Sequence, residues 1–309
     1  MTQWAAFALV VFAVLAVVLV LARATQTASS GGSENRQRRR SAAQLREDAE
    51  AQLRDAAAAQ PHEGGDPQNP DAAEIDGERD AASADGSAID RADRRPERSG
   101  RGARRNDADL QSLSTGALLA NVAVTHGALG AILLVAAWAA DVPATSLGID
   151  AAANVGWPAL GVGLGLGVAL YAGNELLAAN LDRVGIEYSE ELRGALGPDT
   201  LVGWIVLLAV VLPIIAVFEE LLFRAALIGA LSAGFGVSPW VLAAASSLAF
   251  GFGHGIQGPS GMIVTGLLGG VLAAAFVLTG SLLTVIVAHY LINALEFVVH
   301  EGLGIEWAG

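Results

Sequence analysis

The stretch that decides the fold runs from 201 to 227 and reads LVGWIVLLAVVLPIIAVFEELLFRAAL. Its first sixteen residues carry no charge, which favours a helix inside a lipid bilayer. The apolar pattern then continues through Glu219, Glu220 and Arg224. A charge at mid-membrane costs roughly 3 kcal/mol, so such residues persist when they pair, line a cavity or take part in chemistry. The stretch therefore predicts a membrane helix that carries a paired or functional cluster.

The rest of the chain shares this apolar character. Of its 309 residues 53% are hydrophobic, which argues for a membrane protein rather than a soluble domain. Apolar segments lie at 4–22, 114–140, 153–178, 201–232, 238–256, 260–279 and 281–300. We predict an all-α fold, a polytopic transmembrane helical bundle with about six core helices plus an N-terminal anchor helix.

The charged residues divide the chain into three predicted regions. Residues 1–23 are predicted to be a transmembrane anchor; a cleaved signal peptide is the alternative, because ARA at 22–24 resembles a cleavage site. Residues 24–110 mix Arg with many carboxylates and have few large apolar side chains, which predicts a mostly disordered linker with a short helix at 41–60. Interleaved acidic residues and missing aromatics argue against nucleic-acid binding. Residues 111–309 form the predicted membrane domain.

The basic residues also predict a topology. RQRRR at 36–40 follows the anchor, and Arg183 and Arg193 lie in the polar loop 179–200. Because Lys and Arg concentrate on the cytoplasmic side, we place the linker, this loop and the C-terminus in the cytoplasm. The expected location is the cell membrane, with membrane lipids as the surroundings.

Two features of composition narrow the chemistry. The chain has no cysteine, so a metal would have to be held by His, Asp, Glu or Asn. All 18 basic residues are Arg, against 31 acidic residues, which is typical of a halophilic composition or of a GC-rich genome. Gly163 and Gly167 have the small-xxx-small spacing that predicts close helix packing.

Helical spacing separates the three charged residues of the opening stretch. Glu220 and Arg224 stand at i, i+4, so we predict a structural ion pair between them. Glu219 is rotated by about 100° from Glu220 and is not predicted to contact Arg224. Pro213 frees the carbonyl of Ala209 and is expected to disturb the helix just before the glutamates.

Polar residues recur in two later apolar segments. His254 follows Phe250 by four residues, and His289 and Asn293 share a helix face at i, i+4. If these faces converge with Glu219, a carboxylate, two imidazoles and an amide surround one site. We interpret His126 and His300 as structural or incidental, and HEGLG at 300–304 lacks the second histidine of a zincin helix.

Taken in order, the three motifs resemble those of the CAAX-protease and bacteriocin-processing family, also called Abi, whose best-known branch is the type II CAAX prenyl endopeptidases. The motifs lie between 201 and 298 and read Glu219-Glu220-x-x-x-Arg224, Phe250-x-x-x-His254 and His289-x-x-x-Asn293. The resemblance implies an intramembrane endopeptidase with Glu219, His254, His289 and Asn293 as catalytic residues. Its expected substrate is a membrane-associated peptide or protein.

The chemistry expected from this resemblance is hydrolysis of a peptide bond. Glu219, assisted by His254, would activate water, and His289 and Asn293 would donate hydrogen bonds to the oxyanion. A metalloprotease is the other version of the mechanism, with zinc held by Glu219, His254 and His289. Two further functions stay open: a catalytically silent scaffold or immunity protein of the same fold, and a proton-coupled transporter.

Overall fold

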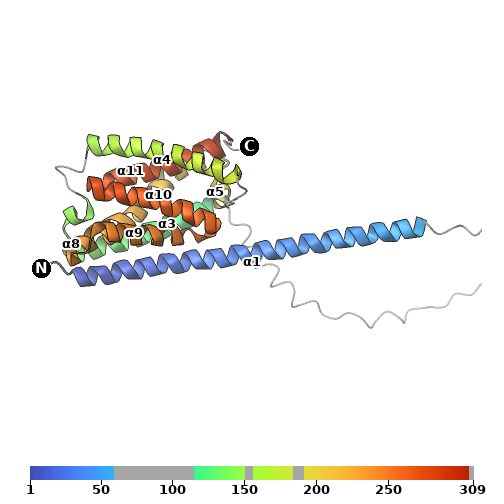
Figure 1. Cartoon of the computed structure of the whole chain (residues 1–309), viewed down its shortest axis with the longest axis horizontal. Coiled ribbons are helices and arrows are strands. Elements are labelled where there is room, and N and C mark those ends of the chain that lie inside the picture. Colours follow the sequence, from blue (N-terminus) through green and yellow to red (C-terminus); the bar gives the residue numbers. More distant parts are fainter. Residues whose placement is uncertain (59–114, 150–155, 184–190, 306–309) are drawn as a thin grey trace, which may run out of the picture. The chain divides into compact units, whose positions relative to one another are not determined.

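The computed structural model describes residues 1–58, 115–149, 156–183 and 191–305. Two compact units divide the chain: Met1–Gly32 with Leu113–Gly309, and Ser33–Ser112. The described residues contain helices and no strand. The predicted linker from 59 to 110 and the start of the segment 153–178 lie outside them. Helices of the first unit form a bundle (Figure 1), which agrees with the predicted fold class.

Within the part of the chain that the structure describes, six helices are long and apolar enough to span a membrane. They are α1 (Trp4–Ala58, apolar over Trp4–Thr27), α3 (Thr115–Ala139), α4 (Trp157–Arg183), the interrupted helix Leu201–Phe235, α10 (Gly258–Thr279) and the C-terminal helix Leu282–Gly302. The predicted span 238–256 corresponds to a shorter helix, α9 (Pro239–Gly253). Its 15 residues are fewer than the roughly 20 that a perpendicular crossing needs.

Helix α1 extends well beyond the predicted anchor. Its first part packs on the membrane domain, where Phe7 and Val11 are buried and the Gln3 N–H donates to the Ala140 carbonyl at 2.8 Å. The helix then continues to Ala58, so residues 24–58 of the predicted linker are helical. The physical reason is that no proline interrupts the chain before Pro61, while Ala, Gln, Arg and Glu favour helix.

The helix of the opening stretch is continuous, and two of its segments are π-helical instead of α-helical. It consists of α6 (Leu201–Val206), the π-helical η2 (Leu207–Val211), α7 (Leu212–Glu220), the π-helical η3 (Leu221–Ala230) and α8 (Leu231–Phe235). The first π-helical segment ends two residues before Pro213, where the missing N–H disturbs the regular ladder. The second begins directly after Glu220 and contains Arg224. Wide turns of this kind are frequent at functional sites.

Helix α4 packs closely against α11 (Leu282–Glu296) (Figure 1). A Cβ atom on Gly163 would lie 2.7 Å from the Thr284 carbonyl oxygen, and one on Gly167 would lie 2.9 Å from Cβ of Leu291. These contacts confirm the predicted close packing of the glycine-rich segment. Later residues of α4 meet later residues of α11, so the two helices run parallel.

A third close contact between helices involves α9 and α10. Helix α9 packs on α10, and a Cβ atom on Gly251 would lie 2.7 Å from the Met262 carbonyl oxygen. Helix α9 ends at Gly253, and His254 follows as its C-terminal cap. The short η4 (Gly255–Gln257) then leads into α10. His254 therefore sits at a helix end rather than within a membrane span.

Candidate active site

The core of the site is a buried ion pair. Arg224 Nη1 lies 3.0 Å from Glu220 Oε1, and both side chains are at most 1% exposed. The pair has the i, i+4 spacing expected from the sequence. Two charges taken out of water are stable only when each has good partners, because desolvation costs several kcal/mol per ion. The surroundings satisfy the pair only in part, because Glu220 Oε2 and Arg224 Nε have no hydrogen-bond partner in the described part of the chain.

Arg224 is held from two further sides. Its Nη2 donates to the Gly269 carbonyl oxygen at 3.0 Å, and its guanidinium carbon lies 4.7 Å from the centre of the Phe250 ring. A Cβ atom on Gly269 would come within 2.7 Å of Phe250, so only glycine lets α10 approach this closely. A guanidinium over an aromatic face gains electrostatic stabilisation when it is desolvated.

Glu220 also holds His289. Its Oε1 accepts from Nδ1 of His289 at 2.7 Å, and the imidazole is buried. A carboxylate only accepts hydrogen bonds, so Nδ1 carries the proton. The contact fixes the ring and leaves its Nε2 on the opposite side, in the way carboxylates orient catalytic histidines. Sequence spacing predicted the partnership of Glu220 with Arg224 but not this one.

Glu219 lies between two imidazoles. Its Oε2 is 3.6 Å from Nε2 of His289, and its Oε1 is 3.9 Å from Nε2 of His126 on α3. Oε2 is buried and has no hydrogen-bond partner in the described part of the chain. An unsatisfied buried carboxylate oxygen is costly and therefore indicates function. The structure thus brings together Glu219 of the first motif and His289 of the third.

The contact with His126 differs from the sequence interpretation, which treated this residue as structural. His126 Nδ1 lies 2.9 Å from the Val122 carbonyl oxygen, and the ring packs edge-on against Phe218, with centroids 5.3 Å apart. Because a carbonyl only accepts, Nδ1 is the donor and Nε2 faces Glu219. Only tertiary packing brings His126 here, since it lies outside the three motifs.

His254 adjoins the site through Phe250. Its Nδ1 lies 2.9 Å from the Phe250 carbonyl oxygen, which makes Nδ1 the donor and leaves Nε2 available. The Phe250 ring packs against the His254 ring, with centroids 4.7 Å apart, and edge-on against His289 at 6.0 Å. Asn293 lies one turn after His289 on α11 and is partly buried.

The residues predicted to bind zinc do not lie together as one group of ligands. Among the described residues, the group of three metal-binding side chains whose ligand atoms lie within 4.8 Å of one another is Glu175, Glu296 and His300. Glu219, His254 and His289 do not form such a group, although Glu219 and His289 approach to 3.6 Å. Their arrangement does not fit a three-ligand zinc site, so no step of the mechanism below uses a metal.

Comparison with known proteins supports the motif-based reading. Residues 201–295 match the family model described as "Type II CAAX prenyl endopeptidase Rce1-like". These residues form an Rce1-like domain. The Rce1-like segment contains Glu219, Glu220, Arg224, Phe250 and the three remaining motif residues His254, His289 and Asn293. No curated protein and no solved structure gives a significant match to the chain.

The family match and the helices together define the general character of the protein. Six apolar helices and a membrane-protease family indicate an integral membrane protein. At the level of the family, the Rce1-like segment supports intramembrane protease activity of the CAAX type. A protease embedded in the membrane acts on membrane-associated proteins or peptides in a lipid environment. His126 lies outside the matched residues.

Proposed function

We propose that the protein is an intramembrane endopeptidase that hydrolyses a peptide bond of a membrane-associated protein or peptide, with Glu219 activating the attacking water. The observation that carries this proposal is the Oε2 atom of Glu219, which is buried and lies 3.6 Å from Nε2 of His289, with no hydrogen-bond partner among the described residues. A carboxylate oxygen with a free lone pair can act as a general base. It is also the acceptor that a nucleophilic water needs.

His254 is proposed to act with Glu219. Its Nδ1–H is engaged by the Phe250 carbonyl, so its Nε2 lone pair is the free one. That lone pair can accept a hydrogen bond from the same water. After attack, the proton taken by Glu219 passes to the leaving amine, and the peptide bond breaks.

His289 and Asn293 are proposed to stabilise the oxyanion. When Nε2 of His289 carries a proton, it can donate to the carbonyl oxygen as negative charge develops there. Glu220, bonded to Nδ1 at 2.7 Å, stabilises this cationic form of the ring. Asn293 offers an amide donor one helical turn away. Arg224 in turn neutralises Glu220, so the ion pair supports the imidazole rather than reacting itself.

The test compares wild type with Glu219→Gln, both purified in detergent and presented with a library of membrane-anchored peptides. The amide keeps the shape of the side chain but cannot act as a base. Cleavage is expected to fall by about 10²- to 10⁴-fold. Glu301→Gln is the matched control, because Glu301 bonds Arg193 in another part of the domain.

Each outcome separates one candidate function from the others. Equal cleavage by wild type and Glu219→Gln would refute the assigned base. No turnover of any peptide by wild type would favour a scaffold or immunity protein, and proton-driven uptake into vesicles would favour a transporter. Zinc content of both proteins is measured in parallel, because zinc lost in His254→Ala together with activity would support the metalloprotease version.

A further inference from the structure

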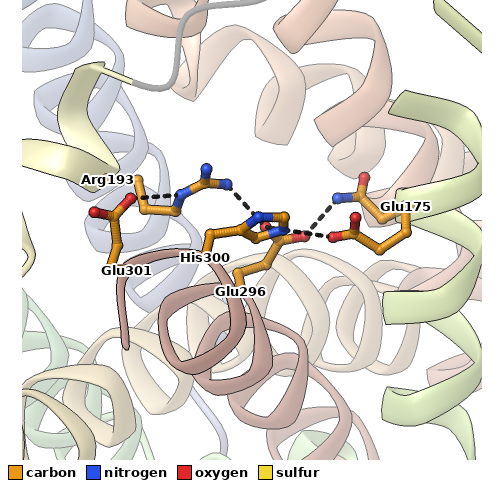
Figure 2. A network of polar contacts seen from close by, with 6 residues as sticks. Glu175, Arg193, Glu296, His300 and Glu301 are labelled. Atoms are coloured by element: carbon orange, nitrogen blue, oxygen red, sulfur yellow. Dashed lines mark hydrogen bonds and ion pairs between the residues drawn. The ribbon is translucent and has the colours of Figure 1, made fainter. Parts of the chain in front are cut away.

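A second polar cluster joins the C-terminal parts of α4 and α11. Glu175 comes from α4, Arg193 from α5 (Glu191–Leu196), Glu296 from α11, and His300 and Glu301 from η5 (Phe297–Gly302). Figure 2 shows these side chains converging. Because His300 follows His289 by eleven residues, about 16 Å separate the two along the helix. The α4–α11 cluster is therefore distinct from the candidate active site.

The ligand-bearing atoms of this cluster are already close together. His300 Nε2 lies 2.8 Å from Glu175 Oε1 and 3.7 Å from Glu296 Oε2. All three ligand atoms lie within 4.8 Å of one another. Zinc bonds of about 2.1 Å at tetrahedral or octahedral angles place ligand atoms about 3.0 to 3.4 Å apart. Shifts of an ångström or less would thus bring the three atoms around one ion.

The cluster also carries excess negative charge. Among the described residues, its three carboxylates, Glu175, Glu296 and Glu301, face the single guanidinium of Arg193. The side chains of Glu175, Glu296 and His300 are at most 15% exposed. Negative charge that is shielded from water requires a cation or a proton for compensation. A divalent ion would balance the two negative charges that remain after Arg193 compensates one carboxylate.

The neighbours of Glu296 orient it as a metal-binding carboxylate is usually oriented. Asn174 donates to its Oε1 at 2.6 Å, and Arg193 Nη1 donates to its Oε2 at 3.1 Å. Each carboxylate oxygen has a further lone pair, so both contacts are compatible with coordination. Outer hydrogen bonds of this kind fix ligand geometry and are part of most metal sites. Arg193 is itself anchored by Glu301 at 3.1 Å.

We propose that Glu175, Glu296 and His300 bind one divalent transition-metal ion of the zinc type. Two carboxylates and an imidazole are the donors that zinc takes in proteins without thiolates. The ion displaces the proton that Nε2 of His300 shares with Glu175 and links α4 to the C-terminal helix. Its role is structural. This proposal concerns a different site from the proteolytic one and does not depend on it.

The test measures zinc binding by the full chain without substrate. The purified protein in detergent is stripped with a chelator, dialysed against Zn²⁺ and assayed for metal by mass spectrometry. Wild type is expected to hold one zinc ion per chain that His300→Ala and Glu175→Gln both lose. Glu301→Gln and His289→Ala are the matched controls and should keep it. Zinc should also raise the melting temperature of wild type but not of His300→Ala.

Three results would overturn the proposal. The first is wild type that retains no zinc after dialysis, in which case protons alone balance the cluster. The second is His300→Ala that binds zinc like wild type. The third is loss of zinc in His289→Ala but not in His300→Ala, which would move the ion to the candidate active site. The first result concerns wild type alone, so it contradicts the proposal even if a variant fails to fold.

Discussion

Two clusters of Glu, Arg and His lie in one membrane domain, and they differ in how completely they are satisfied. In the candidate active site, Glu220, Arg224 and His289 are almost fully buried. Among the described residues, Oε2 of Glu219, Oε2 of Glu220 and Nε of Arg224 have no hydrogen-bond partner. In the α4–α11 cluster, the side chains keep 12 to 26% exposure, and both oxygens of Glu296 accept hydrogen bonds. Residue types alone do not distinguish the two sites. Burial combined with an unpartnered atom indicates where the chemistry is.

The largest expected difference between the clusters is catalytic. His289→Ala removes the ring between Glu219 and Glu220, so cleavage should fall by about 10²- to 10³-fold, as when an oxyanion donor is lost. His300→Ala removes the same residue type from the other cluster, and cleavage should change less than twofold. Initial rates with one membrane-anchored peptide measure both. A comparable loss in His300→Ala would contradict the assignment of the two clusters.

The next largest difference concerns stability. Arg224→Ala leaves Glu220 buried without its guanidinium and should cost about 3 to 5 kcal/mol of unfolding free energy. Arg193→Ala breaks pairs whose side chains keep 15 to 26% exposure, so its cost should be smaller, about 1 to 2 kcal/mol. Reversible unfolding in mixed detergent micelles compares the variants. Equal costs would mean that the two clusters are equally desolvated, against the structure.

Sequence reasoning succeeded where the relevant partners are local. Hydropathy predicted the order of the apolar helices, because the bilayer requires long uncharged segments. The i, i+4 rule predicted the contact of Glu220 with Arg224, and small-residue spacing predicted the packing of Gly163 and Gly167. Each of these inferences needs only the periodicity of one helix.

Sequence reasoning did not predict contacts between residues that lie on helices distant in the sequence. The contact of His126 with Glu219 depends on which face α3 presents to α7, and periodicity within α3 does not specify that. The contact of His300 with Glu175 is equally hidden from periodicity, because the two residues are 125 positions apart in the sequence. The length of α1 was underestimated for another reason. Charged composition indicated a linker, but the absence of proline up to Pro61 allows one helix to continue.

Helix packing allows a third test, because the α4–α11 cluster depends on the approach of its two helices. Gly163→Ala would place a Cβ 2.7 Å from the Thr284 carbonyl oxygen and should cost about 1 to 3 kcal/mol. Gly165→Ala is the matched control, because its Cβ would meet nothing within 4 Å and alanine favours helix. Thermal unfolding followed by circular dichroism compares the two. Equal effects would exclude a close approach at Gly163.

The smallest expected effect concerns His126, the one described contact of Glu219 that comes from outside the Rce1-like segment. His126 lies 3.9 Å from Oε1 and is 26% exposed, so water can replace much of what it provides. His126→Ala should therefore lower kcat about tenfold, less than the roughly 10²-fold or more that a general acid or base contributes, with KM unchanged.

His126→Gln provides the matching control, because its amide can restore a polar contact with Glu219 and should recover part of the rate. Melting temperatures of both variants should equal that of wild type, since the Val122 carbonyl can bond to water instead. A loss as large as that of Glu219→Gln would make His126 part of the essential machinery. No loss at all would make the contact incidental and confine the catalytic groups to the segment that the family motifs cover.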